Sequence, residues 1–294
     1  MNATDMKDSQ GRQQTRGQKT LVTVLSILSI CVLICVFVLS VLPPRVKRYA
    51  YVVKQKGQLK SIDTAVGLFK DDFDYYPPSD ALDEAGVDYC GAMKLCEAVM
   101  GKDLLGFHQD SIFRRDGTDG AGKLLYPDDR GDYTDMPRKG PYLPLDNHNA
   151  YKLADLYGKA NTGPFDPKHF VMCDVFRHVT HRILVKKVGM PILYYKADTS
   201  KTAHDVDDPN NPDNIYNYKD NHALLALGVP GKPGVKHPMY EDPKIFYEIT
   251  KNHKNLTQNE PHRAETYILI SAGPDGLYGT PDDIANFEWK WKRE

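Results

Sequence analysis

The chain has little cysteine and almost no net charge. Only 5 of its 294 residues are cysteine, so a scaffold held together by many disulfides is excluded. Cys31 and Cys35 lie in an apolar run. The others, Cys90, Cys96 and Cys173, leave room for one disulfide at most. The formal net charge of −1 gives no electrostatic basis for binding nucleic acid.

Signatures of common enzymes are also missing. The sequence has no Gly-x-Ser-x-Gly, no phosphate-binding Walker loop and no dinucleotide-binding fingerprint. Acidic residues are plentiful, at 39, yet no spacing pairs two of them as a general acid and base. We therefore expect that the protein is not an enzyme.

Near its start the chain has one long apolar run. Residues 21–42 contain no charged side chain, and as a helix they would span roughly 33 Å, enough for the core of a bilayer. A cleaved secretory signal would have a shorter apolar segment and a small-residue cleavage site. The sequence therefore predicts an uncleaved transmembrane helix over 21–42, preceded by a disordered polar segment over 1–20.

A second helix is predicted directly after this run. Apolar residues recur there at intervals of three and four positions, namely Leu59, Ile62, Val66, Phe69 and Phe73. Charged residues stand between them, so the spacing indicates one apolar stripe on an amphipathic helix that packs against a core. We expect a stalk helix over 43–76, because two prolines follow it.

The C-terminal region carries the strongest candidate site. An apolar run over 267–270 predicts a strand, which leads into a loop rich in glycine and proline over 271–284. Asp275, Asp282 and Asp283 lie in this loop. Ca²⁺ favours six to eight oxygen ligands from carboxylates and backbone carbonyls, and the loop has no histidine or cysteine for zinc. The pattern predicts Ca²⁺, and the alternative is an ordinary solvated Asp/Gly turn.

The region between these ends yields coarser expectations. We expect a helix over 92–105 and a buried strand over 191–195. The segment 116–120 is typical of a turn, and the polar segment 204–214 is typical of a solvated surface loop. None of these segments contains a complete set of metal ligands.

Two segments resemble the major pseudopilin of bacterial type II secretion. Residues 53–77 are similar to the stalk helix of that family, which ends in a Leu/Phe-Lys-x-Asp-x-x-x-Tyr-Pro pattern. Residues 270–284 are similar to its calcium-binding loop. The two matches occur in the family's order and at the two ends of the domain.

The resemblance implies an α+β, pilin-like fold. In such a fold a long N-terminal transmembrane and stalk helix packs on a small antiparallel sheet. The head would cover 77–294, with a large loop-rich insertion over about 79–264 and a calcium loop over 270–284. The resemblance implies six residues that would bind Ca²⁺ through side chains or backbone carbonyls: Asp275, Asp282, Asp283, Ser271, Leu277 and Thr280.

A function and a location are implied as well. The chain would be a membrane-anchored, pseudopilin-like structural component of a type II secretion or type IV pilus-like system. Its partners would be the bacterial inner membrane and other pseudopilins or secretion-system inner-membrane proteins. Charges beside 21–42 weakly favour a cytoplasmic C-terminal domain, but large domains translocate despite such charges. We therefore expect a cytoplasmic N-terminus and a periplasmic head.

Two departures from the family keep other interpretations open. Gln18 stands where a prepilin leader ends in glycine, and Thr23 stands where the family has glutamate. The insertion is also far larger than the family's small sheet needs. The alternative is a non-polymerising, envelope-anchored binding protein that uses the insertion as its recognition surface. An envelope enzyme with its site in the insertion is the remaining class.

Overall fold

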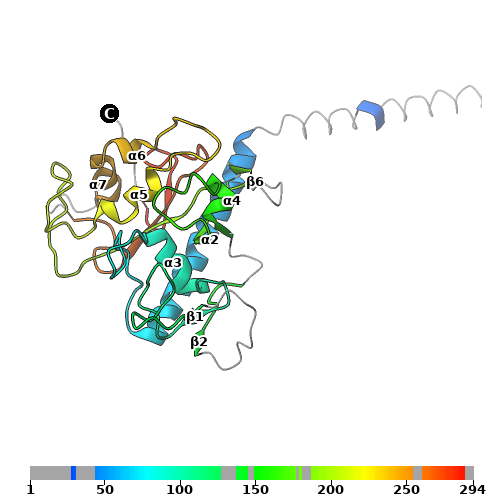
Figure 1. The fold of residues 1–294 in the computed structure, drawn as a ribbon. Coiled ribbons are helices and arrows are strands. Elements are labelled where there is room, and N and C mark those ends of the chain that lie inside the picture. The colour runs from blue at the N-terminus through cyan, green and yellow to red at the C-terminus, as the bar shows by residue number, and fades with distance from the viewer. Residues whose placement is uncertain are drawn as a thin grey trace, which may run out of the picture. The chain divides into compact units, whose positions relative to one another are not determined.

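The structure is a computed structural model that describes residues 28–30, 44–126, 137–144, 149–176, 179–180, 187–253 and 260–288. The chain divides into two compact units, 1–50 and 51–294, and each is described by itself. The first unit contains a helical stretch at 28–30 and the first turns of helix α2. The second unit holds all other described elements (Figure 1).

Helix α2, Pro44–Phe73, supplies the apolar stripe that the sequence predicts. Leu59, Ile62, Val66 and Phe69 are buried, and Phe73 is half-buried against the core. Proline at the first helical position costs no hydrogen bond. The helix ends at Asp74, which has a positive φ of 64° and donates its backbone N–H to the Lys70 carbonyl at 2.7 Å.

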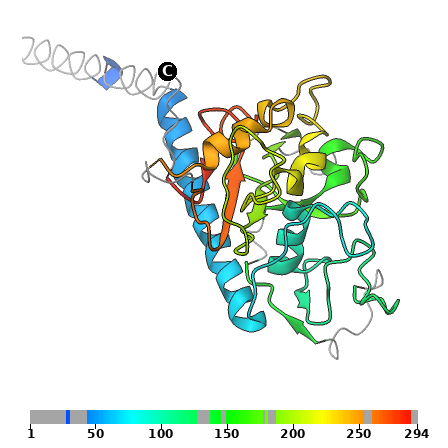
Figure 2. The ribbon, with the colours of Figure 1, turned by 90° about the vertical axis from the view of Figure 1, so that its left-hand side faces the viewer.

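A three-stranded antiparallel sheet lies against α2 (Figure 2). Its strands are β7 (Leu193–Lys196), β8 (Tyr267–Ser271) and β9 (Ile284–Ala285), in the order β7-β8-β9. The register places Tyr194 opposite Leu269 and Ser271 opposite Ile284. The strands predicted over 191–195 and 267–270 are therefore present, with the first displaced by about two residues.

The central strand β8 is buried on both faces. Tyr267 and Leu269 belong to the hydrophobic cluster that includes the apolar stripe of α2. Ile268 and Ile270 point the other way, into a second cluster built mainly by the region between α2 and β8. Successive side chains of a strand alternate between faces, so one five-residue strand joins both halves of the core.

The remaining described elements are short. Some precede β7 in the chain, and the others lie between β7 and β8. Three two-stranded antiparallel sheets pair β1 with β2, β3 with β4 and β5 with β6. Their strands are β1 (Phe107–His108), β2 (Arg138–Lys139), β3 (Ala150–Lys152), β4 (Phe170–Met172), β5 (Val179–Thr180) and β6 (Lys187–Val188). The short helices are α4 (Leu153–Tyr157), η1 (Tyr218–Asn221), α5 (His222–Leu225), α6 (Pro238–Glu241) and α7 (Lys244–Thr250).

Helix α3, Gly91–Met100, is the predicted helix of the 92–105 segment, and all ten of its residues are buried. It ends five residues earlier than predicted because Gly101 stops it. Gly101 has a φ of 83° and donates its N–H to the Glu97 carbonyl. A Cβ at this glycine would lie 2.1 Å from the Gly106 carbonyl oxygen, so the turn accepts no other residue without rearrangement.

The prediction of a pilin-like fold on a transmembrane stalk is wrong. In the part of the chain that the structure describes, no helix is long and apolar enough to cross a membrane. The long helix α2 instead carries charged residues such as Lys54, Lys56 and Lys60, which are exposed, in addition to its buried apolar stripe. The described fold is a mixture of helices and small antiparallel sheets.

The same finding contradicts the predicted single-pass location in the bacterial inner membrane. Of the segment 21–42 itself, only 28–30 is described. The predicted disordered segment 1–20, which includes the leader position Gln18, lies outside the described residues.

A polar contact fastens α2 to the sheet. Asp63 Oδ1 accepts hydrogen bonds from the Tyr267 hydroxyl at 2.8 Å and from Asn286 Nδ2 at 2.9 Å. Asn286 Oδ1 in turn accepts the backbone N–H of Leu269 at 2.9 Å. Arg263 Nη2 lies 3.7 Å from the same Asp63 oxygen. One carboxylate on α2 therefore aligns the helix with β8 and the residue after β9.

Replacing this carboxylate should loosen the helix from the sheet. We expect Asp63→Ala to lower the free energy of unfolding by about 1–3 kcal/mol, because a nearly buried Tyr267 hydroxyl loses its acceptor. Urea unfolding followed by circular dichroism measures the change. Asp71→Ala, on the exposed side of α2, is the matched control and should shift stability by less than about 0.5 kcal/mol. Equal effects of the two substitutions would contradict the assignment.

Candidate metal site

The predicted calcium loop is held between two adjacent strands. β8 ends at Ser271, β9 begins at Ile284, and these two residues face each other in the ladder. Residues 272–283 therefore form a loop whose ends are fixed by the sheet. Because β8 is buried on both faces, the loop starts from the most rigid part of the core.

Gly273 lets the two arms of the loop touch. It has a φ of 61°, and a Cβ on it would lie 2.0 Å from the carbonyl oxygen of Asp282. Further along, Gly279 has a φ of 91° and packs against the backbone of Met239 in α6, where a Cβ would approach to 2.8 Å. Both positions require glycine because of backbone conformation and lack of space.

Asp275 and Asp282 stand close together across the loop. The Asp275 backbone N–H donates to Asp282 Oδ2 at 3.0 Å, and Asp275 Oδ1 accepts the Leu277 N–H at 2.7 Å. Partial burial raises the pKa of Asp275, and the neighbouring Asp282 carboxyl raises it further. Thr280 Oγ1 donates to Asp282 Oδ1 at 2.6 Å. Two acidic groups therefore share one side of the loop.

Asp283 is the buried member of the set. Its residue is 3% exposed, and its Oδ2 accepts the Gly279 N–H at 2.7 Å. Its Oδ1 is buried and has no hydrogen-bond partner. Burial raises the pKa of Asp283 well above its ordinary value, and the charges of Asp275 and Asp282 add to the effect. An unpartnered buried carboxylate oxygen is costly, and a cation is the kind of group that would satisfy it.

The other predicted ligands are only partly in place. The carbonyl oxygen of Leu277 lies 3.3 Å from Thr280 Oγ1, and the carbonyl of Thr280 accepts from the Asp283 N–H at 3.2 Å. These two residues thus form one turn with the carboxylates. Ser271 differs, because its hydroxyl donates to Asp174 Oδ2 at 2.9 Å, inside the core.

The donor set fits a hard cation but is not a closed cage of side chains. Within the described ranges, no group of three or more histidine, cysteine, aspartate or glutamate residues is placed to hold a metal. Ca²⁺ at this loop would therefore need backbone carbonyls in addition to the three carboxylates, as calcium sites commonly do. The absence of nitrogen and sulfur donors in the loop does not suit zinc.

Asp174 is a functional neighbour that the sequence analysis missed. It is 2% exposed, and its Oδ1 accepts the N–H groups of Phe176 and Met190 at 3.0 and 3.2 Å. Through Ser271 it reaches the first residue before the loop. Burial raises its pKa to about 8. The signal in the sequence is one charged residue inside the otherwise apolar stretch 170–176.

The raised pKa of Asp174 makes a pH-dependent contribution to stability. Its folded-state pKa lies above the ordinary value of 3.8, so the folded protein keeps a proton that the unfolded chain has released. Stability should therefore fall as pH rises from about 4 to about 8, by up to about 1.4 kcal/mol per pH unit from this group.

Asp174→Asn tests this contribution, because the amide keeps the acceptor for Phe176 and Met190 but does not titrate. We expect the fall in unfolding free energy between about pH 4 and 8 to become shallower by that amount. Urea unfolding at a series of pH values provides the measurement. Asp207→Asn, on an exposed loop, should leave the slope unchanged. An identical slope in wild type and Asp174→Asn would refute the assignment.

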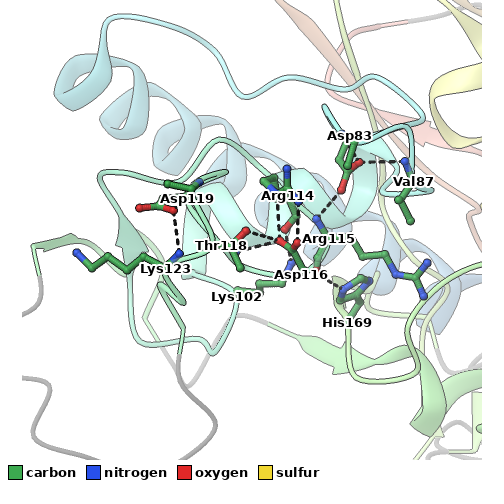
Figure 3. A network of polar contacts seen from close by, with 12 residues as sticks. Asp83, Val87, Lys102, Arg114, Arg115, Asp116, Thr118, Asp119, Lys123 and His169 are labelled. Atoms are coloured by element: carbon green, nitrogen blue, oxygen red, sulfur yellow. Dashed lines mark hydrogen bonds and ion pairs between the residues drawn. The ribbon is translucent and has the colours of Figure 1, made fainter.

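In other acidic turns that the structure describes, neighbouring residues donate hydrogen bonds to the carboxylates. Figure 3 shows Asp116, whose Oδ2 accepts from Arg114 Nη2 at 2.8 Å and whose Oδ1 accepts the Thr118 N–H at 3.0 Å. The hydrogen bond from Arg114 lowers the pKa of Asp116. Asp119 Oδ1 accepts the Lys123 N–H at 3.0 Å. The prediction of a turn over 116–120 is confirmed.

The polar loop 204–214 is folded on itself in the same way. Asp205 Oδ1 accepts the N–H groups of Asp207 and Asp208, both at 3.0 Å. Asp205 Oδ2 accepts from Asn211 Nδ2 at 3.1 Å. Its residues are exposed or half-buried, except for His204 and Asn214, which are buried. The predicted surface loop is therefore present, with its two ends inside the protein.

The cysteines of the second unit form no disulfide. Cys90, Cys96 and Cys173 are free and buried. Burial raises the pKa of the Cys90 thiol to about 12, so it does not serve as a nucleophile near neutral pH.

Comparison with known proteins finds no relative of the chain. No family model matches the chain, and neither the curated proteins nor the solved structures contain a significant match. The function is therefore inferred from the geometry of the molecule.

Proposed function

We propose that the chain is a non-catalytic structural protein, a pseudopilin-like component of a secretion or filament system, whose unit 51–294 is stabilised by Ca²⁺. The single observation that supports this most strongly is the buried and unpartnered Oδ1 of Asp283, next to Asp275 and Asp282. A bound Ca²⁺ would supply positive charge beside Asp283, whose carboxylate interacts with the charges of Asp275 and Asp282. Ca²⁺ would stabilise the loop that joins β8 to β9. This role requires no reaction on a substrate.

The role that follows is assembly with other proteins of the same kind. The support for this role is the resemblance of the sequences 53–77 and 270–284 to segments of the pseudopilin family, together with the oxygen-rich loop that joins β8 to β9. Other pseudopilins, or proteins of a type II secretion or related filament system, are the partners proposed. A binding protein is the alternative, and the cavity described below favours it.

Thermal melting with Ca²⁺ and with chelator tests the proposal. Binding to the folded state alone should raise stability by about 2.7 kcal/mol at a hundredfold excess over Kd, which corresponds to a rise in Tm of roughly 5–10 °C for a chain of this size. Asp283→Asn should remove most of the rise. Asp207→Asn, the matched control on an exposed loop, should retain it.

Two results would contradict the calcium assignment. The first is coincident melting curves in Ca²⁺ and chelator. The second is an equal rise in Tm with Mg²⁺ at the same concentration, because Mg²⁺ prefers a stricter octahedral geometry.

Calcium binding should also release protons. Asp275 and Asp283 have raised pKa values because of burial and mutual charge, so part of the free protein carries protons that Ca²⁺ must displace. The apparent affinity should therefore increase as pH rises from about 5 to 8. Calorimetric titration in two buffers of different ionisation enthalpy measures the protons released. Heats that are independent of the buffer would show that these carboxylates do not take up Ca²⁺.

A further inference from the structure

A cavity of about 550 Å³ opens at the end of β8 opposite to the calcium loop. It lies between the end of α2, the turn after β7 and the short helix η1. Residues from all three segments line it, among them Tyr76, Ser79, Lys201, Asp220 and Glu265. Glu265 stands two residues before β8, whereas the calcium loop follows the last residue of that strand. The two sites are therefore separate.

Asp220 forms the floor of this cavity. The residue is 4% exposed, and its Oδ2 accepts a short hydrogen bond from Ser79 Oγ. Ser79 Oγ itself accepts the Lys196 backbone N–H at 2.9 Å, so the serine hydroxyl is fixed in place. Among the described residues, Asp220 Oδ1 receives no hydrogen bond. A buried carboxylate in the lining of a cavity thus keeps one oxygen available.

Among the residues that the structure describes, no lysine forms an ion pair with this carboxylate. The buried Lys94 donates to the carbonyls of Asp80 and Leu82, both at 2.8 Å. Lys201 pairs with Asp198 at 3.5 Å. Burial raises the pKa of Asp220, and Asp80 raises it further, while Ser79, Lys94 and Lys201 oppose the shift. Lys70, Lys196 and Lys201 also line the cavity, but its carboxylates outnumber them, namely Asp74, Asp80, Asp198, Asp220 and Glu265.

The wall of the cavity favours an organic cation. Asp74, Asp80 and Glu265 line it without an ion pair among the described residues, which opposes an anion. The rings of Tyr75 and Tyr76 also line it. Lys70 Nζ lies over the Tyr76 ring, 5.6 Å from its centroid, so Tyr75 is the aromatic face left for an alkylammonium group. No cluster of three or more metal-ligating side chains occurs within the described ranges, so a metal ion is a poorer fit than an ammonium group.

We infer that this cavity binds a primary alkylammonium group, with Asp220 and Glu265 as its anionic contacts. The group could belong to a free diamine or to a lysine side chain of a peptide. The inference goes beyond the proposed calcium-dependent function and does not depend on it, because no residue is shared between the two sites.

Calorimetric titration of the full chain in chelator tests the inference separately from calcium. The probes are 1,5-diaminopentane and a short peptide with one central lysine, and the same peptide with norleucine in place of lysine is the uncharged control. We expect saturable binding of at least one amine and none of the norleucine peptide. Binding of the diamine alone identifies a small-molecule site, and tighter binding of the lysine peptide identifies a peptide site.

Two variants locate the binding in the cavity. Asp220→Asn should weaken amine binding at least tenfold, because the buried negative charge is lost. Glu265→Lys, at the exposed rim, should weaken amine binding severalfold without affecting the core. This variant therefore tests the location of binding if Asp220→Asn does not fold. Asp119→Asn, a matched control in the distant turn of Figure 3, should bind as wild type.

The inference is overturned if neither amine binds at millimolar concentration, or if the norleucine peptide binds as well as the lysine peptide. It is equally overturned if folded Asp220→Asn and Glu265→Lys both bind amines as tightly as wild type. Loss of the calcium-induced rise in Tm with intact amine binding would refute only the proposed function, and the reverse result would refute only this inference.

Discussion

Burial of β8 on both faces is the constraint on which the rest of the second unit depends. Tyr267 and Leu269 pack on the stripe of α2, while Ile268 and Ile270 pack on the elements inserted between them in the sequence. Each such side chain contributes about 1.5–3 kcal/mol by leaving water. The strand therefore sets the position of the helix, the insertion and both candidate sites, since the calcium loop leaves one end of it and the cavity opens beside the other.

The parts of this fold that could be predicted are those encoded by residues close together in the sequence. The stripe on α2, the apolar run of β8 and the turn at 116–120 are encoded by residues within a few positions of one another, and each was predicted correctly. The membrane-spanning stalk was not. Its apolar run at 21–42 is a composition signal, whereas the described long helix begins at Pro44 and carries charged residues throughout. Length and hydropathy of one segment do not determine which segment becomes the long helix of the fold.

The candidate sites divide in the same way. Asp275, Asp282 and Asp283 are close in sequence, so their proximity in space was predictable. The core-facing hydroxyl of Ser271 was not, because its partner Asp174 is 97 residues away. Asp220 and Ser79 are 141 residues apart, and neither belongs to a motif. Sites assembled by tertiary packing leave only weak traces in a single sequence, such as one acidic residue within an apolar stretch.

The wide separation of contacting residues also affects when this protein can fold during its synthesis. Asp63 on α2 accepts a hydrogen bond from Tyr267 across 204 positions of the chain. A ribosome must therefore release the chain as far as β8 before the apolar stripe of α2 meets its strand. Until then the stripe is exposed to water and to other chains, and contacts of such long range form slowly.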